Sequence, residues 1–75
     1  MPDDEICVRF SRAEALVLFE WLARVDDAKS APIEHPAEQK LLWLLEGQLE
    51  KQLEVFASNY KHLVEEARII VDQSY

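Results

Sequence analysis

The side chains best suited to chemistry in this sequence are two histidines, one cysteine and a few serines. His62 and Glu66 stand four residues apart, a spacing at which two side chains of one helix can bind the same metal ion. Two ligands do not make a site and no second pair points to them, so an exposed helix face is the simpler interpretation. His35 stands between Glu34 and Pro36 in a predicted loop, where nothing fixes its orientation for proton transfer.

Nucleophilic chemistry has no better support. Cys7 lies between Ile6 and Val8 and follows acidic residues, and nearby negative charge disfavours the reactive thiolate. The single glycine, Gly47, excludes a glycine-rich phosphate-binding loop, and the serines lack a nucleophile motif. The sequence therefore predicts a protein that is not an enzyme, with no cofactor and no bound metal ion.

Length and composition predict one small domain that needs a partner. The chain has 75 residues and one cysteine, so no internal disulfide is available to stabilise it. A domain this short has little interior, yet 49% of its residues are hydrophobic. Such a surplus of apolar side chains is typical of an oligomer.

The charge excludes several classes of partner. The net charge is −7, from 15 acidic and 8 basic residues. Such a charge favours solubility and repels nucleic acid and anionic membranes. The acidic start of the sequence is unlike a secretory signal, and the apolar runs are far shorter than a membrane span. We therefore expect a cytoplasmic protein that binds neither nucleic acid by itself nor a membrane.

The pattern of apolar residues predicts a mainly α-helical single domain. The expected elements are one short strand at about 6–10 and three helices at about 12–27, 36–56 and 59–72. Ser11 and Glu14 have the spacing of a capping box at the start of the first helix, and Pro36 is favoured at the first position of the second. The first helix is apolar on nearly every side, which indicates that it packs against more than one neighbour.

The second and third helices each carry one apolar stripe. Along the second helix the stripe consists of Leu41, Leu42, Leu45, Leu49, Leu53 and Phe56. Along the third helix it consists of Tyr60, Leu63, Val64, Ala67, Ile70 and Val71. The apolar faces of the three helices are expected to meet in one core.

The predicted strand needs a partner. Ile6, Val8 and Phe10 alternate with Cys7 and Arg9, which is the period-two pattern of a half-buried strand. A single strand cannot satisfy its own backbone donors and acceptors, and the sequence offers no second one. Antiparallel pairing with the same strand of a second copy would meet this need and form a homodimer. The alternative is an extended arm lying across the helices.

Five segments carry a resemblance that covers nearly the whole chain. They are residues 16–22, 37–39, 42–46, 49–51 and 60–68. Their pattern resembles a family of short bacterial proteins known only as uncharacterised, and it implies no activity. A weaker resemblance is to ribbon-helix-helix regulators, whose dimers begin with a paired strand followed by two helices. Cys7 and Arg9 depart from that pattern, because a DNA-reading ribbon needs a polar and basic set at its outward positions.

Three glutamates on the second helix form a possible interaction surface. Glu46, Glu50 and Glu54 follow one another at i,i+4, where like charges destabilise an isolated helix. The usual explanation is an exposed face that keeps the protein soluble. The functional interpretation is a surface that binds basic groups of a second subunit or of a basic partner.

Trp43 is the second candidate for an interaction site. It projects roughly 140° from the centre of the leucine stripe, so it cannot join the same core. Leu44 and Gly47 lie near it, and a glycine lets another element approach closely. An aromatic side chain beside a small residue is typical of a contact surface. The alternative is that the N-terminal arm or the loop before the second helix covers Trp43 within one chain.

Together these features predict a homodimeric protein–protein interaction or regulatory module without catalysis, of the antitoxin, immunity-protein or adaptor kind, which acts on a basic partner. Two alternatives stay open. One is a ribbon-helix-helix-like regulator that binds DNA, and the other is a pocket for a small ligand between the helices of the dimer.

Overall fold

Three helices make up the regular structure of the protein. The computed structural model describes residues 4–53 and 57–75, and its helices are α1 (Arg12–Ala28), α2 (Pro36–Gln52) and α3 (Tyr60–Ser74). The mainly helical fold class is therefore confirmed. Within this described part, no helix is both long enough and apolar enough to cross a membrane.

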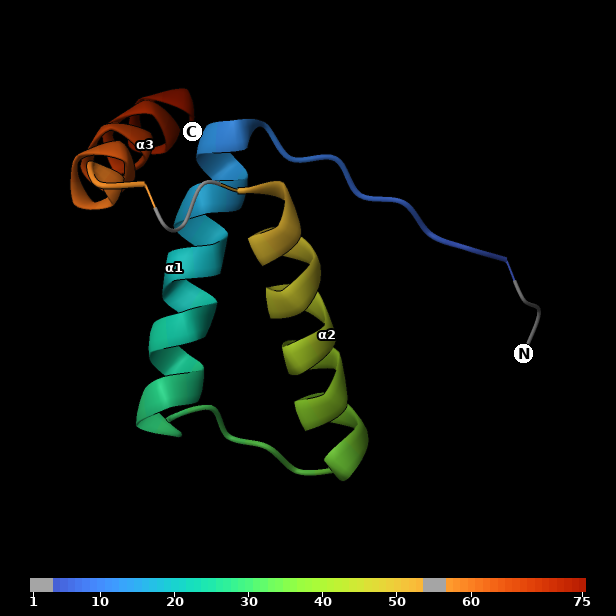
Figure 1. The fold of residues 1–75 in the computed structure, drawn as a ribbon. Helices are drawn as coiled ribbons and strands as arrows, with labels where there is room; N and C mark the ends of the chain where they lie inside the picture. The colour runs from blue at the N-terminus through green and yellow to red at the C-terminus, as the bar shows by residue number, and fades with distance from the viewer. Residues whose placement is uncertain (1–3, 54–56) are drawn as a thin grey trace.

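α1 is the central helix. It packs antiparallel to α2 on one side and against α3 on another (Figure 1). The described residues of α2 and α3 do not pack against each other. The prediction that the first helix is covered on more than one side is confirmed, because both other helices depend on α1 for their packing.

The capping box predicted at the start of α1 is confirmed. The Glu14 backbone N–H donates to Ser11 Oγ at 3.1 Å, and the Ser11 backbone N–H donates to Glu14 Oε1 at 2.7 Å. The Tyr75 hydroxyl donates a further hydrogen bond to Glu14 from the end of the chain. These bonds, with that from the Ser11 backbone the strongest, hold the pKa of the Glu14 carboxyl below its ordinary value.

α2 begins where the sequence predicts, and His35 contributes to that start. Its ring Nδ1 accepts a hydrogen bond from the Ala37 backbone N–H at 3.0 Å. His35 directly precedes Pro36, which occupies the first helical position. His35 is therefore a helix cap with a defined orientation, which the sequence alone did not indicate.

The predicted end of α2 near residue 56 is wrong, because the helix ends at Gln52. Leu53 has an extended backbone (φ −114°, ψ 156°), and its side chain packs against the core between α1 and α3. Tertiary packing at Leu53 thus overrides the local helical pattern. Phe56, the last residue of the predicted stripe, lies outside the described residues.

The core is small and centred on α1 and α3. Its buried centre is formed by Leu16, Val64 and Ala67, and the apolar residues packed around this centre are Ala13, Val17, Leu53, Tyr60 and Leu63. Tyr60 also donates from its hydroxyl to Glu20 Oε2 at 2.7 Å, which fixes the start of α3 on α1. Helix α3 therefore uses the face that its sequence pattern predicts, over slightly different bounds from the expected 59–72.

The predicted strand at 6–10 is wrong for the single chain. No strand occurs among the described residues, and the segment before α1 extends away from the helices as an arm (Figure 1). Ile6 is 91% exposed and Val8 69%, while Phe10 is nearly half exposed. A strand requires backbone hydrogen bonds to a second strand, and residues 4–53 and 57–75 of one copy provide none.

Candidate interaction surface

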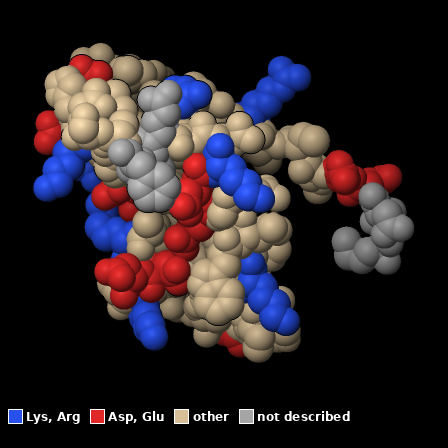
Figure 2. Space-filling model, viewed as in Figure 1, with Lys and Arg blue, Asp and Glu red and all other residues tan. Residues whose placement is uncertain are grey.

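Acidic side chains gather along the seam between α1 and α2. Figure 2 shows these acidic side chains as a red band on one face of the molecule, and lysines and arginines lie around the edges of the band. Of the three predicted glutamates, Glu46 is half-buried in the seam, Glu50 is exposed, and Glu54 lies outside the described residues. The first of them is therefore not simply a solubilising surface group.

Asp26 connects the acidic seam to Trp43. Its Oδ1 accepts hydrogen bonds from Trp43 Nε1 at 3.2 Å and from Gln39 Nε2 at 3.3 Å. Two side chains of α2 are thereby held against the C-terminal part of α1. We call Asp26, Gln39, Trp43 and Glu46 the Trp43 cluster.

Glu46 is the member of the Trp43 cluster whose hydrogen bonding is incomplete. Its Oε1 is buried and has no hydrogen-bond partner among the described residues. Burial raises the pKa of the Glu46 carboxyl above its ordinary value, and the charge of Asp26, a side-chain hydrogen bond between protonated Glu46 and Asp26, and the charge of Glu50 raise it further. A proton on Glu46, or a positive charge brought by another molecule, would reduce the cost of burying this carboxyl beside other negative charges.

The raised pKa predicts that Glu46 makes the fold less stable near neutral pH. A carboxyl group whose pKa is higher in the folded state stabilises the fold below its unfolded pKa of 4.5, and this contribution is lost as pH rises through the folded pKa. We therefore expect Glu46→Gln to be more stable than the natural protein at pH 7, with the advantage vanishing below pH 4.5. Urea denaturation of both proteins across this range measures the difference.

The control for this measurement is Glu65→Gln, which removes the same charge from an exposed position on α3. It is expected to show no comparable gain at pH 7, because no buried carboxyl is removed. An equal gain in both variants would assign the effect to net charge rather than to the environment of Glu46.

The side of α2 that carries the predicted contact residues is largely uncovered by the described part of the chain. These residues are Trp43, Leu44 and Gly47. Trp43 is 56% exposed despite its bond to Asp26, and Leu44 is 55% exposed. A Cβ built on Gly47 would meet no atom within 4 Å. The described part of the chain therefore neither buries Trp43 nor makes a close approach at Gly47.

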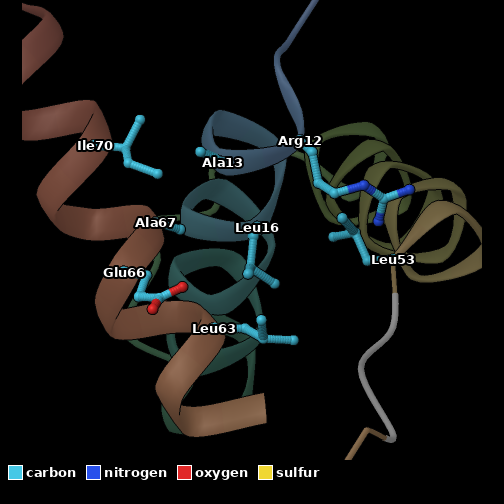
Figure 3. Close-up of a pocket in the computed structure, with 8 residues that line it drawn as sticks. All are labelled: Arg12, Ala13, Leu16, Leu53, Leu63, Glu66, Ala67 and Ile70. Atoms are coloured by element: carbon cyan, nitrogen blue, oxygen red, sulfur yellow. The ribbon is translucent and has the colours of Figure 1, made fainter. Parts of the chain in front are cut away.

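A groove between α1 and α3 is a second open apolar surface. It has a volume of about 260 Å³ and is lined by Arg12, Ala13, Leu16, Leu53, Leu63, Glu66, Ala67 and Ile70. Figure 3 shows Ala13, Leu16 and Leu63 between Arg12 and Glu66, with Leu53 beside Arg12 and Ile70 on the side of Glu66. The groove exists because Leu53 approaches the core from the end of α2 while α2 itself stays away from α3.

His62 and Glu66 pair with each other on the surface of α3. Their Nε2 and Oε1 atoms are 2.8 Å apart, and both side chains are more than half exposed. In the part of the chain that the structure describes, no group of three or more histidine, cysteine or acidic side chains is arranged to hold a metal ion. The pair is exposed on α3, and Glu66 also lines the groove.

The sequence suggests Trp43 and Glu46 as contact residues but gives no sign of Asp26, which lies beside both. Asp26 is one acidic residue among 15 in the sequence, and only the pairing of α1 with α2 places it beside Trp43. The groove was also missed, since it depends on how α3 crosses α1. Its only sequence signal is that two apolar stripes are longer than their buried parts. Leu53 extends the stripe of α2 and Ile70 extends that of α3, and both line the groove.

Comparison with known proteins adds no relative. No protein-family model, no curated protein and no solved structure matches this chain. The resemblance to short bacterial proteins and the weaker one to ribbon-helix-helix regulators stay predictions. Function is therefore argued from the chain's own surfaces.

Proposed function

We propose that this protein is a non-catalytic protein–protein interaction module that acts as a homodimer. The observation that carries the proposal is the surface left open by a single chain. The chain exposes 6453 Å², whereas a folded monomer of its mass exposes roughly 4700 Å². The surplus of roughly 1700 Å² exceeds the roughly 800 Å² per partner that a standard interface covers.

The side chains on this surface support the same proposal. Among the described residues only five apolar side chains are buried, and eleven large ones are exposed. They occur on the arm, on all three helices, in the loop between α1 and α2 and after α3, as Ile6, Val8, Phe10, Trp21, Ile33, Leu41, Trp43, Leu44, Ile69, Ile70 and Tyr75. Exposed apolar area of this extent is a mark of surfaces that bind other proteins.

The acidic seam favours a basic partner. Glu46 carries a buried oxygen that accepts no hydrogen bond from the described residues, and Trp43, on the same helix, has a half-exposed ring. A lysine or arginine of a partner would supply the donor to Glu46 and a cation over the indole ring. An antitoxin, immunity protein or adaptor that sequesters a basic protein would use such a surface, and the net charge of −7 would speed the encounter.

The arm is the second contact of the proposed module and attaches one copy to another. Burial of its apolar residues Ile6, Val8 and Phe10 would be favourable, and its backbone has no strand partner among the described residues of its own chain. Antiparallel pairing of two arms is one way to meet both needs. Docking of the arm on the helices of the second copy is another.

The homodimer is tested by light scattering after size exclusion. At micromolar concentration we expect twice the chain mass of 8.7 kDa. Dilution should shift the mass towards that of one chain by mass action, and it should lower the melting temperature as well. A chain that remains monomeric and fully folded across this concentration range would contradict the proposal.

A further inference from the structure

We propose that the groove between α1 and α3 is the binding site for the N-terminal arm of a second copy of this chain. In this arrangement Ile6, Val8 and Phe10 of one subunit lie against Leu16, Leu53 and Ile70 of the other. The inference rests on the proposed homodimer and specifies which surfaces form it. A two-fold symmetric dimer would contain the contact twice, with each subunit giving one arm and one groove.

The groove has the size and the lining for such side chains. Six of its eight lining residues are apolar, and they come from α1, from α3 and from Leu53 after α2. An apolar cavity of about 150 Å³ already holds a benzene-sized molecule. The groove, at about 260 Å³, therefore has room for a phenyl ring together with an aliphatic side chain.

The arm supplies the matching shape. In extended backbone alternate side chains point to the same side, so Ile6, Val8 and Phe10 can enter a groove while Cys7 and Arg9 stay outside. Ile6 and Val8 are the most exposed apolar residues of this segment, so they gain most from being covered.

Charges at the two ends favour the same pairing. The groove is bordered by Arg12 and Glu66, which Figure 3 shows on opposite sides of the apolar lining. The arm carries Glu5 before its apolar residues and Arg9 among them. One orientation of the arm therefore brings Glu5 towards Arg12 and Arg9 towards Glu66, with opposite charges at both borders.

The arm of the same chain is poorly placed to fill this groove. Arg12 and Ala13 line the groove and follow the arm directly, so Ile6 and Val8 would have to reverse direction within a few residues. The capping box holds Ser11 in an extended conformation (φ −66°, ψ 164°), and from there the arm runs outward (Figure 1). A second copy meets no such constraint.

The test places a cysteine on the side of the arm that enters the groove, by Val8→Cys, and removes Cys7, the only cysteine of the sequence, by Cys7→Ser. A second cysteine is introduced at the border of the groove by Glu66→Cys, and the protein is oxidised mildly at micromolar concentration. We expect a disulfide between the cysteine introduced on the arm of one chain and the cysteine introduced at the groove of the other, seen as a band at twice the chain mass without reductant. Helical content by circular dichroism checks that the variant folds.

The matched control is Glu65→Cys, which places a thiol on a different face of the same helix, outside the groove. It should cross-link far less than Glu66→Cys. A disulfide closed within one chain would show that its own arm fills the groove, and a Cys7–Cys7 link in the natural protein would show that arms pair with each other. Either result overturns the inference.

A second pair of variants tests the contact without oxidation. Val8→Asp puts a charge among the residues that enter the groove, whereas Cys7→Asp puts it on the outward side of the arm. We expect Val8→Asp to weaken dimerisation roughly tenfold or more, and Cys7→Asp to have little effect. If the natural protein is a dimer but neither cross-link nor variant behaves so, the inference fails and the homodimer stands, leaving the groove to a small apolar ligand. A monomer would contradict both.

Discussion

Leu16→Ala is expected to lower the free energy of unfolding by about 2–5 kcal/mol. Leu16 is 7% exposed and belongs to the buried cluster with Val64 and Ala67 of α3. Its truncation leaves a cavity on the central helix, on which both other helices depend. A chain of this length is stable by roughly 4–11 kcal/mol, so the variant should be largely or wholly destabilised. Urea denaturation followed by circular dichroism measures the loss.

The control for this variant is Leu41→Ala, the same substitution at a residue of α2 that is 63% exposed. It should change the free energy of unfolding by about 0.5 kcal/mol or less, because most of this side chain is already in water. Both variants are compared at one protein concentration, since dimerisation contributes to apparent stability. Equal losses at the two positions would mean that the core lies elsewhere than the structure places it.

Local signals in the sequence were sufficient to predict the three helices. The capping box of Ser11 and Glu14 marks the start of α1, and Pro36 marks the start of α2. Both depend on residues only a few positions apart, so no knowledge of the tertiary structure is needed. The apolar residues on nearly every side of α1 likewise predict its central place, because a helix without a polar face must be covered on several sides.

Features that depend on distant residues were not predictable in the same way. Leu53 continues the periodicity of α2, yet it ends the helix because its side chain packs on the cluster between α1 and α3. The period-two pattern of the arm predicted a strand that the single chain does not form, because a strand needs a second backbone to pair with. The groove and the bond from Trp43 to Asp26 follow from the way the helices pair, which no local pattern specifies.

Trp43→Ala is expected to weaken binding of the partner by about 2 kcal/mol or more, roughly a 30-fold rise in Kd. The indole ring is 56% exposed while its N–H is held by Asp26, so the ring is presented in a fixed orientation beside the acidic seam. An aromatic side chain that is already ordered loses little entropy when a partner covers it. The measurement is capture of proteins from a lysate of the cells that make this chain, followed by titration of the purified partner.

The cost of Trp43→Ala to the subunit itself should be smaller, at roughly 1 kcal/mol, because one hydrogen bond and a half-exposed ring are lost. Trp21→Ala is the matched control, since Trp21 is 51% exposed on α1 but makes no hydrogen bond to the Trp43 cluster. It should leave capture of the partner unchanged. If Trp43→Ala binds the partner as the natural protein does and only melts earlier, its indole serves the pairing of α1 with α2 alone. If Trp21→Ala abolishes binding equally, the partner covers a different face, and the acidic seam is then a solvated surface whose charge keeps the protein soluble.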